Sequence, residues 1–146
     1  MRPVPALLAG LLLLTACSGE FVESKSEADT TALVQQHADA LAGVVGEPLR
    51  DPATGPMPCS GTRDGYAVQG AYNIDVPDGE EPRATLGRVR SDWTAKGYEI
   101  TDDREIGAYE GVLAAKTEDG FSLDIETVSR DAFAVLLHSP CFARPS

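Results

Sequence analysis

The stretch GYAVQGAYNIDV, residues 65–76, alternates between two kinds of side chain. Large apolar side chains occupy one set of positions, namely Tyr66, Val68, Tyr72, Ile74 and Val76. The positions between them hold Ala67, Gln69, Ala71, Asn73 and Asp75. Because successive residues of a strand point to opposite faces of a sheet, the stretch predicts a strand that is buried on one face. Other elements must cover that face.

Two segments have the periodicity of amphipathic helices and can supply the cover. In residues 30–45 apolar side chains recur at steps of three and four, and the pattern stops near Gly46. A second stripe runs through residues 83–96, and Gly97 stands where a left-handed residue ends a helix. The stripes consist of Leu33, Val34, Ala38, Leu41, Val44 and Val45 in the first segment and Leu86, Val89 and Trp93 in the second.

Four further stretches read as strands, while a proline-rich segment reads as a loop. The strands are YEITDD (98–103), GVLAAKT (111–117), FSLDIETV (121–128) and AFAVLLH (132–138). In the third of them Ser122, Asp124 and Glu126 alternate with apolar residues, which predicts a sheet face in water. Residues 47–61, with their prolines and glycines, predict a loop.

These elements predict an α+β fold. We expect a two-layer domain, in which two helices pack on one face of a mainly antiparallel sheet of four or five strands. The predicted order along the chain is α-β-α-β-β-β-β.

The N-terminal residues MRPVPALLAGLLLLTAC predict export. Their apolar run of about thirteen residues is too short for the roughly 20 that a membrane span needs, and its layout predicts a signal peptide cleaved after Ala16. Leu14-Thr15-Ala16-Cys17 resembles the lipobox of bacterial lipoproteins, in which the cysteine receives a diacylglycerol. The resemblance implies a signal peptide at residues 1–16, the lipidated Cys17 with a polar tether at residues 17–29, and one domain at residues 30–146.

The chain has three cysteines, Cys17, Cys59 and Cys141. Lipidation of Cys17 leaves Cys59, just before the first predicted strand, and Cys141, just after the last. In an oxidising compartment these two predict a disulfide between the ends of neighbouring antiparallel strands. In the alternative, an ordinary secreted protein, Cys17 is a structural thiol.

Charge and the scarcity of reactive residues exclude several functions. With 23 acidic and 12 basic residues the formal net charge is −11, which repels nucleic acid and anionic lipid head groups. The histidines are His37 and His138, and adjacent residues such as His138 and Ser139 point to opposite faces of a strand, so they are poorly placed as a base and a nucleophile. No metal-ligand or phosphate-loop spacing occurs. We therefore expect no catalysis, metal, cofactor or nucleic-acid partner.

The aromatic side chains have two interpretations. Tyr66, Tyr72, Trp93 and Tyr98 fall at positions that face the predicted core. They either pack between helices and sheet or line a pocket for a small apolar ligand in that layer.

The chain as a whole resembles the small lipoproteins of actinobacteria. The shared features are the lipobox, the polar tether, a cysteine before the first strand, a helix ending in W-x-x-x-G-Y (residues 93–98), and a final S-x-C (residues 139–141). The resemblance implies a surface-anchored, non-catalytic domain. Because of the anchor and the missing catalytic constellation, we expect a lipid-anchored domain on the outer face of the cytoplasmic membrane that binds another envelope protein or supports an envelope assembly. A carrier of a small apolar ligand and a cell-envelope hydrolase that uses His138 are the alternatives.

Overall fold

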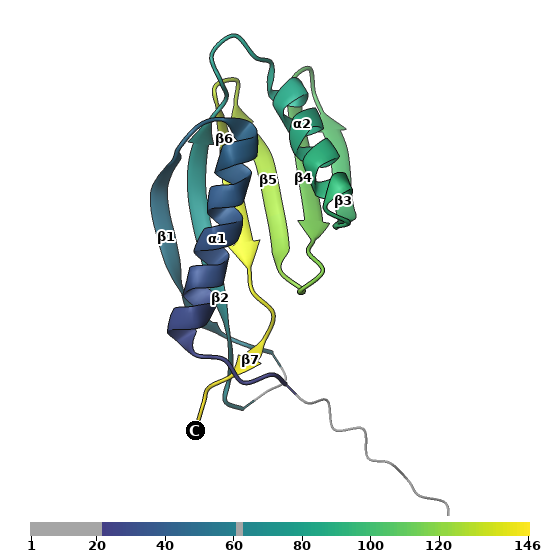
Figure 1. Cartoon of the computed structure of the whole chain (residues 1–146). Coiled ribbons are helices and arrows are strands. Elements are labelled where there is room, and N and C mark those ends of the chain that lie inside the picture. Colours follow the sequence, from purple (N-terminus) through teal and green to yellow (C-terminus); the bar gives the residue numbers. More distant parts are fainter. Residues whose placement is uncertain (1–21, 61–62) are drawn as a thin grey trace, which may run out of the picture.

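The computed structural model describes residues 22–60 and 63–146, which form two helices and seven strands (Figure 1). The elements follow in the order α1 (Glu27–Val45), β1 (Leu49–Pro58), β2 (Gly65–Asp75), α2 (Pro82–Ala95), β3 (Glu99–Ile106), β4 (Glu110–Lys116), β5 (Ser122–Ser129), β6 (Ala132–His138) and β7 (Phe142–Ala143). The predicted α+β class and the mainly antiparallel sheet are confirmed. None of these helices is both long and apolar enough to cross a membrane.

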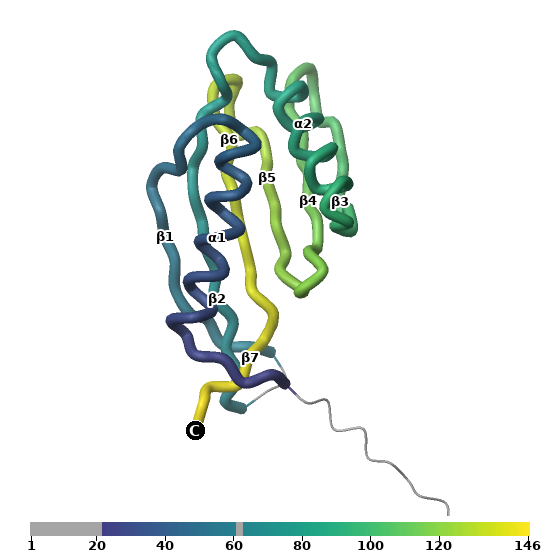
Figure 2. Tube along the Cα trace, viewed as in Figure 1, coloured from purple at the N-terminus to yellow at the C-terminus, as the bar shows by residue number. Residues whose placement is uncertain are grey.

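The strands form one sheet in the order β1-β2-β6-β5-β4-β3, and β7 pairs with β2 beyond the end of β6 (Figure 2). Every pair of neighbouring strands is antiparallel. The succession helix, edge strand, inner strand occurs twice, as α1-β1-β2 and as α2-β3-β4, at opposite edges of the sheet. The β5–β6 hairpin fills the centre between these two units.

Both helices pack on the same face of the sheet and bury the core there (Figure 1). The helix α1 contacts β1, β2 and β6, whereas α2 contacts β3 and β4. The largest fully buried side chains are Trp93, Tyr66, Phe121, Phe133, Leu41 and Ile74. In β2 every second residue is buried, which confirms the predicted strand with one buried face.

Local signals set the helix ends. Ser26 caps α1 by accepting a hydrogen bond from the Asp29 amide (3.1 Å), so the folded part begins upstream of the expected start at Thr30. At the end of α2, Gly97 adopts a φ of 76° and the Tyr98 amide donates to the Trp93 carbonyl (2.9 Å), as the sequence predicts.

The predicted strand count and order were wrong at two places. Residues 49–58 form β1 rather than a loop, and the order therefore begins α-β-β instead of α-β-α. The prolines that suggested a loop are tolerated because β1 is an edge strand, where a missing amide donor need not break a ladder. The strand β7 is only two residues long, which is too short for a visible alternation.

The predicted disulfide between Cys59 and Cys141 is confirmed, with 6.0 Å between their Cα atoms. Cys59 lies between β1 and β2, and Cys141 lies between β6 and β7. Because β2 and β6 are antiparallel neighbours, the start of one meets the end of the other. The bond therefore fastens the centre of the sheet at one end.

Candidate functional site

The structure describes all of the predicted site residues except Cys17, which lies outside the described residues. Cys59 and Cys141 form the disulfide at the end of the sheet from which β7 continues. Near it, the fully buried Tyr66 donates a hydrogen bond to the Lys25 carbonyl (2.6 Å) and lies 2.8 Å from Thr30 Oγ1. These contacts hold the segment that leads into α1, so Tyr66 has a structural role.

The four aromatic residues of the predicted pocket do not surround one space. Trp93 is buried in the core, and Tyr72 and Tyr98 line different surface hollows. The Tyr72 hydroxyl lies 3.2 Å from Thr54 Oγ1 and donates to Gln35 Oε1 at 3.3 Å. Together with Tyr66, Trp93 and Tyr72 are used as packing between the helices and the sheet.

His138 and Ser139 are adjacent in sequence, but they contact different parts of the sheet. Ser139 Oγ accepts a hydrogen bond from the Val68 amide (2.8 Å) and donates one to the Pro140 carbonyl (2.7 Å). His138 pairs in register with Gln69 and Ser122. Ser139 therefore fastens β6 to β2, and the geometry does not make a nucleophile of it.

The sheet face turned away from the helices is the feature with the most room for binding. We call it the open face. Register sets its side chains in rows that cross the strands, and one row runs through Ala53, Ala71, Leu136, Asp124, Ala114 and Asp102. The next row runs through Arg50, Asn73, Ala134, Glu126, Val112 and Arg104. The centre of the open face is thus apolar and built of small side chains, and charges lie on β5 and at the edges.

A hollow of about 450 Å³ lies at this centre, and we call it the central hollow. Its lining comes from β1, β2, β5 and β6 and comprises Asp51, Ala71, Tyr72, Asn73, Asp124, Glu126, Ala134, Val135 and Leu136. Asp51 has a φ of 52° and accepts a hydrogen bond from Asn73 Nδ2 (2.9 Å). Three carboxylates therefore border an apolar floor.

Asp124 is the most perturbed of these acids. Burial raises its pKa first, and the nearby charges of Glu126 and Asp102 raise it further, against the opposite effects of Arg104 and His138. The side chain is half-buried in a position that the sequence assigns to water. Ionisation of Asp124 on the open face therefore carries an electrostatic cost that Arg104 and His138 relieve only in part.

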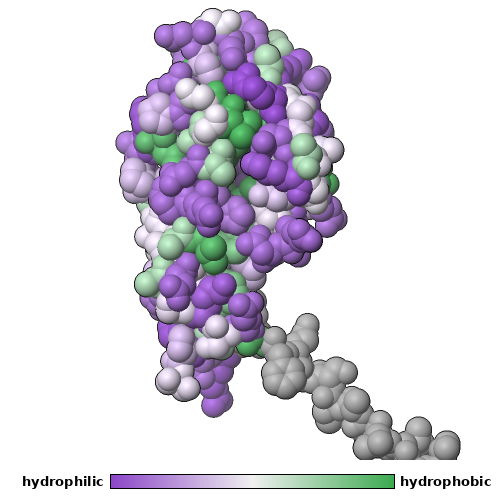
Figure 3. All heavy atoms as spheres, viewed as in Figure 1, coloured by the Kyte–Doolittle hydropathy of each residue, from purple (hydrophilic) through white to green (hydrophobic). Residues whose placement is uncertain are grey.

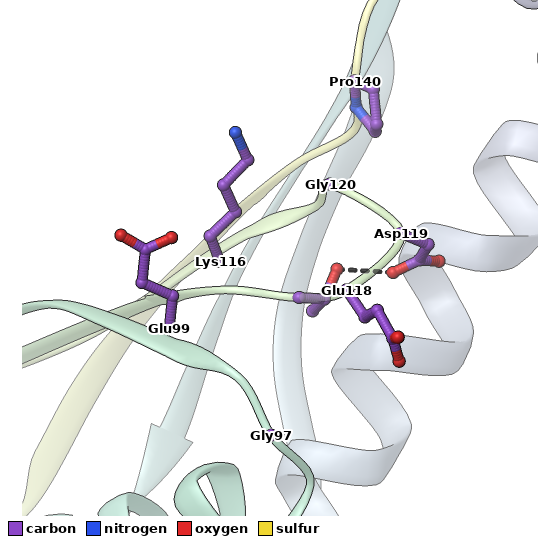
Figure 4. A pocket seen from close by; sticks show the side chains of 8 residues that line it. Gly97, Glu99, Lys116, Glu118, Asp119, Gly120 and Pro140 are labelled. Carbon is purple, nitrogen blue, oxygen red and sulfur yellow. Dashed lines mark hydrogen bonds between the residues drawn. The ribbon is translucent and has the colours of Figure 1, made fainter.

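A second and larger hollow of about 820 Å³ lies at the end of the sheet, between the turn that leads into β3 and the β4–β5 turn (Figure 4). We call it the end groove. Its lining is Gly97, Glu99, Lys116, Thr117, Glu118, Asp119, Gly120 and Pro140. Thr117 donates to Asp119 (2.5 Å), and Asp119 lies 3.5 Å from His37 Nε2 on α1. In Figure 4 the side chain of Glu118 lies on the opposite side from Lys116, so the charged groups do not converge on one point.

We favour the central hollow as the candidate site despite its smaller volume. Its floor consists of adjacent strands, whereas the end groove lies between turns and is open to solvent. Regular strands hold side chains more precisely than turns do. Within the described residues, no group of three or more His, Cys, Asp or Glu residues is arranged to hold a metal ion.

The view in Figure 3 shows the side that the helices cover. It is mostly hydrophilic, with small hydrophobic areas. The large exposed apolar side chains are few among the described residues, namely Val22, Met57, Ile106 and Val128. At the centre of the open face the apolar residues Ala71, Ala134 and Leu136 are half-buried.

The chain matches no protein-family model, and comparison with curated proteins and with solved structures also finds no match.

Proposed function

We propose that this chain is a lipid-anchored domain on the outer face of the cytoplasmic membrane, and that it binds a partner protein of the cell envelope through its open face. The observation that carries the proposal is the central row of the open face, where the apolar Ala71, Leu136 and Ala114 lie on three different strands, with Asp124 between the last two. Small apolar side chains in such a row let the backbone of another protein approach closely. Burial of this row by a partner would be favourable by roughly 25 cal/mol per Å² of apolar surface.

The position of the chain ends supports an anchored domain. The Lys25 amide donates to the Ala143 carbonyl (3.0 Å), and the Ala143 amide donates to the Glu23 carbonyl (3.0 Å). The first described segment, the C-terminal strand and the disulfide therefore share one end of the domain (Figures 1 and 2). An anchor at Cys17 would attach at that end and leave the open face accessible from the side.

A binding function is also favoured over the two alternatives. A hydrolase based on His138 needs a nucleophile within reach, and the Ser139 hydroxyl is engaged with the backbone. A carrier with its ligand between the layers needs room there, and Tyr66 and Trp93 are buried in close packing. We therefore propose a non-catalytic role.

The anchor is tested by the intact mass of the protein extracted from membranes, measured with and without reduction. We expect cleavage before Cys17, an added diacylglycerol, and a gain of about two daltons when the disulfide is reduced. A mass without lipid, with a free thiol at Cys17, would contradict the anchor and leave a secreted protein.

The partner surface is tested by a photo-crosslinking residue placed at Leu136 in cells that make the protein. Gln36, an exposed residue of α1, is the matched control position. We expect one discrete adduct from position 136 and none from position 36. Equal adducts from both positions, or none from 136, would overturn the use of the open face.

A further inference from the structure

We infer that the partner presents a cationic segment, with lysine or arginine side chains beside apolar ones, to the central hollow. This inference rests on the proposed function, because it names the chemistry of the partner that the open face binds. It is carried by the shape of the hollow and by the distribution of charge around it.

The floor of the hollow suits the aliphatic part of a long basic side chain. Ala71, Leu136 and Ala134 come from neighbouring strands, and the first two are directly opposite in register. Lysine and arginine bury their methylene stems against such apolar surface while their charged ends reach polar groups at its border. A volume of about 450 Å³ has room for a few side chains rather than for a whole element.

The border of the hollow carries negative charge without a counter-ion. Asp124 lies opposite Leu136 in register and Glu126 lies opposite Ala134, so both acids stand on β5 beside the apolar floor. In the described part of the chain, neither carboxylate forms a salt bridge. Two like charges therefore stand together beside the apolar floor at the centre of the open face.

Other acids of the open face pair with arginine side chains, in contrast to Asp124 and Glu126. Asp75 pairs with Arg50 at one edge, and Asp102 accepts a hydrogen bond from Arg104 Nε (2.8 Å) at the other. The outer carboxylates Asp75 and Asp102 are thus in direct contact with a cation, whereas Asp124 and Glu126 interact with Arg104 without a salt bridge and can receive a cation from a partner. Burial is the main cause of the raised pKa of Asp124, and the neighbouring charge of Glu126 adds to it.

Charge complementarity also excludes two other occupants. A second copy of this chain, docked face to face with the two-fold axis at the central hollow, would bring Asp124 and Glu126 toward their counterparts, and like charges across an interface are costly. An acidic partner would meet the same repulsion together with the formal net charge of −11. A basic segment is attracted both by Asp124 and Glu126 and by the net negative charge of the chain. It would therefore associate faster at low ionic strength.

The inference is tested by backbone NMR of the full chain in detergent micelles, titrated with two short synthetic peptides. One peptide carries arginine and leucine, and in the other glutamate replaces arginine. We expect the arginine peptide alone to shift the amide signals of Ala71, Asp124, Ala134 and Leu136. Binding should weaken as salt is added, because screening reduces attraction between exposed charges.

Two variants sharpen the test. Asp124→Asn/Glu126→Gln removes the two carboxylates of the central hollow that stand on β5 and leaves Asp51, and we expect it to weaken binding of the arginine peptide by about tenfold. Glu99→Gln/Glu118→Gln removes the same charge from the end groove and should leave the affinity within about twofold of the original. The control therefore separates local recognition from attraction to an acidic protein in general.

Each other outcome overturns the inference. Equal binding of both peptides at the hollow would indicate a partner recognised by its apolar surface alone. Equal weakening by both double variants would indicate unspecific attraction, and shifts confined to other regions would place the cation elsewhere. In all of these cases the crosslink at position 136 still decides the proposed function separately, because it does not depend on the partner's charge.

Discussion

At the scale of single residues, Gly70 shows how closely α1 approaches the sheet. A Cβ atom added at Gly70 would lie 2.7 Å from Val34 Cγ1 and 2.9 Å from the Tyr72 ring. Val34 is buried and branched at Cβ, so it has little freedom to move away. We expect Gly70→Ala to lower the free energy of unfolding by about 1–3 kcal/mol, measured by urea denaturation.

Gly43 provides the control for this substitution, because a Cβ added there meets no heavy atom within 4 Å. It lies inside α1, where alanine is the better helix former. Gly43→Ala should therefore raise the free energy of unfolding by about 0.5–1 kcal/mol. If both variants changed the free energy of unfolding in the same direction, the close contact between Gly70 and Val34 would not be what makes an added Cβ at Gly70 destabilising.

A second prediction at this scale concerns Asp124 and pH. Its pKa is raised in the folded state by burial and by Glu126, so between the unfolded and folded pKa values the folded chain binds more protons than the unfolded one. Stability is therefore lost as the pH rises through that window. We expect Asp124→Asn to raise the melting temperature at neutral pH, with a gain that shrinks below about pH 4.

Thermal melts at several pH values measure this effect. Glu99→Gln, which removes an exposed charge near the end of the same sheet, is the control for net charge. A gain from Asp124→Asn that did not depend on pH would mean that its carboxylate is not destabilising in the folded state. A carboxylate that lowers stability and borders a hollow is what a binding site is expected to contain.

At the scale of elements, Arg88 joins the two helices. From α2 its Nε donates to the Val44 carbonyl (3.0 Å) and its Nη2 to the Val45 carbonyl (2.9 Å), at the end of α1. Its Nη1 donates to Glu80 (2.9 Å). The last turn of α1 has no basic residue of its own, so Arg88 supplies the cation that the negative end of the helix favours.

We expect Arg88→Lys to lower the free energy of unfolding by about 1–2 kcal/mol, because lysine keeps the charge but loses the forked geometry. Hydrogen bonds from Thr85 and Arg88 lower the pKa of Glu80, so the variant should also raise that pKa toward its ordinary value. Urea denaturation and NMR titration of Glu80 measure the two effects. Arg90→Lys is the control, because its exposed pair with Asp103 contributes at most about 1 kcal/mol.

The elements also show what could be read from the sequence. The strand at residues 65–76 and both helices are visible because their patterns are local and depend on neighbours in the chain. The prolines of β1 led to the prediction of a loop, because the sequence does not show that the strand lies at an edge, where prolines are tolerated. The row that contains Ala71, Leu136 and Asp124 depends on the register between strands far apart in sequence, so local sequence patterns cannot predict it.

At the scale of the whole molecule, the disulfide closes most of the domain into one loop. Cys59 and Cys141 are 82 residues apart in sequence. By restricting the unfolded chain, a loop of this size should contribute about 4 kcal/mol in the chain-entropy account. We expect Cys59→Ser/Cys141→Ser to lower the free energy of unfolding by about that amount.

Urea denaturation with and without a reductant checks this prediction. The reductant should destabilise the original chain to the level of the double variant and leave the variant unchanged. A variant as stable as the oxidised protein would show that the covalent link does not limit the unfolded state. Sequence reasoning found this bond because two cysteines bracket the central strands, whereas the hollow depends on pairings that only the structure reveals.

The pairing of residues 23–25 with Ala143 has a mechanical consequence. A force applied to the chain at Val22 would be shared by two backbone hydrogen bonds to Ala143 and by the Tyr66 hydroxyl on the Lys25 carbonyl. From Ala143 the load passes to Cys141 and across the disulfide to Cys59, which directly follows β1 and whose amide donates to the Gly65 carbonyl at the start of β2 (3.2 Å). Tension on the tether would therefore travel into the sheet through the disulfide as well as into α1, which begins at Glu27 directly after the pulled segment.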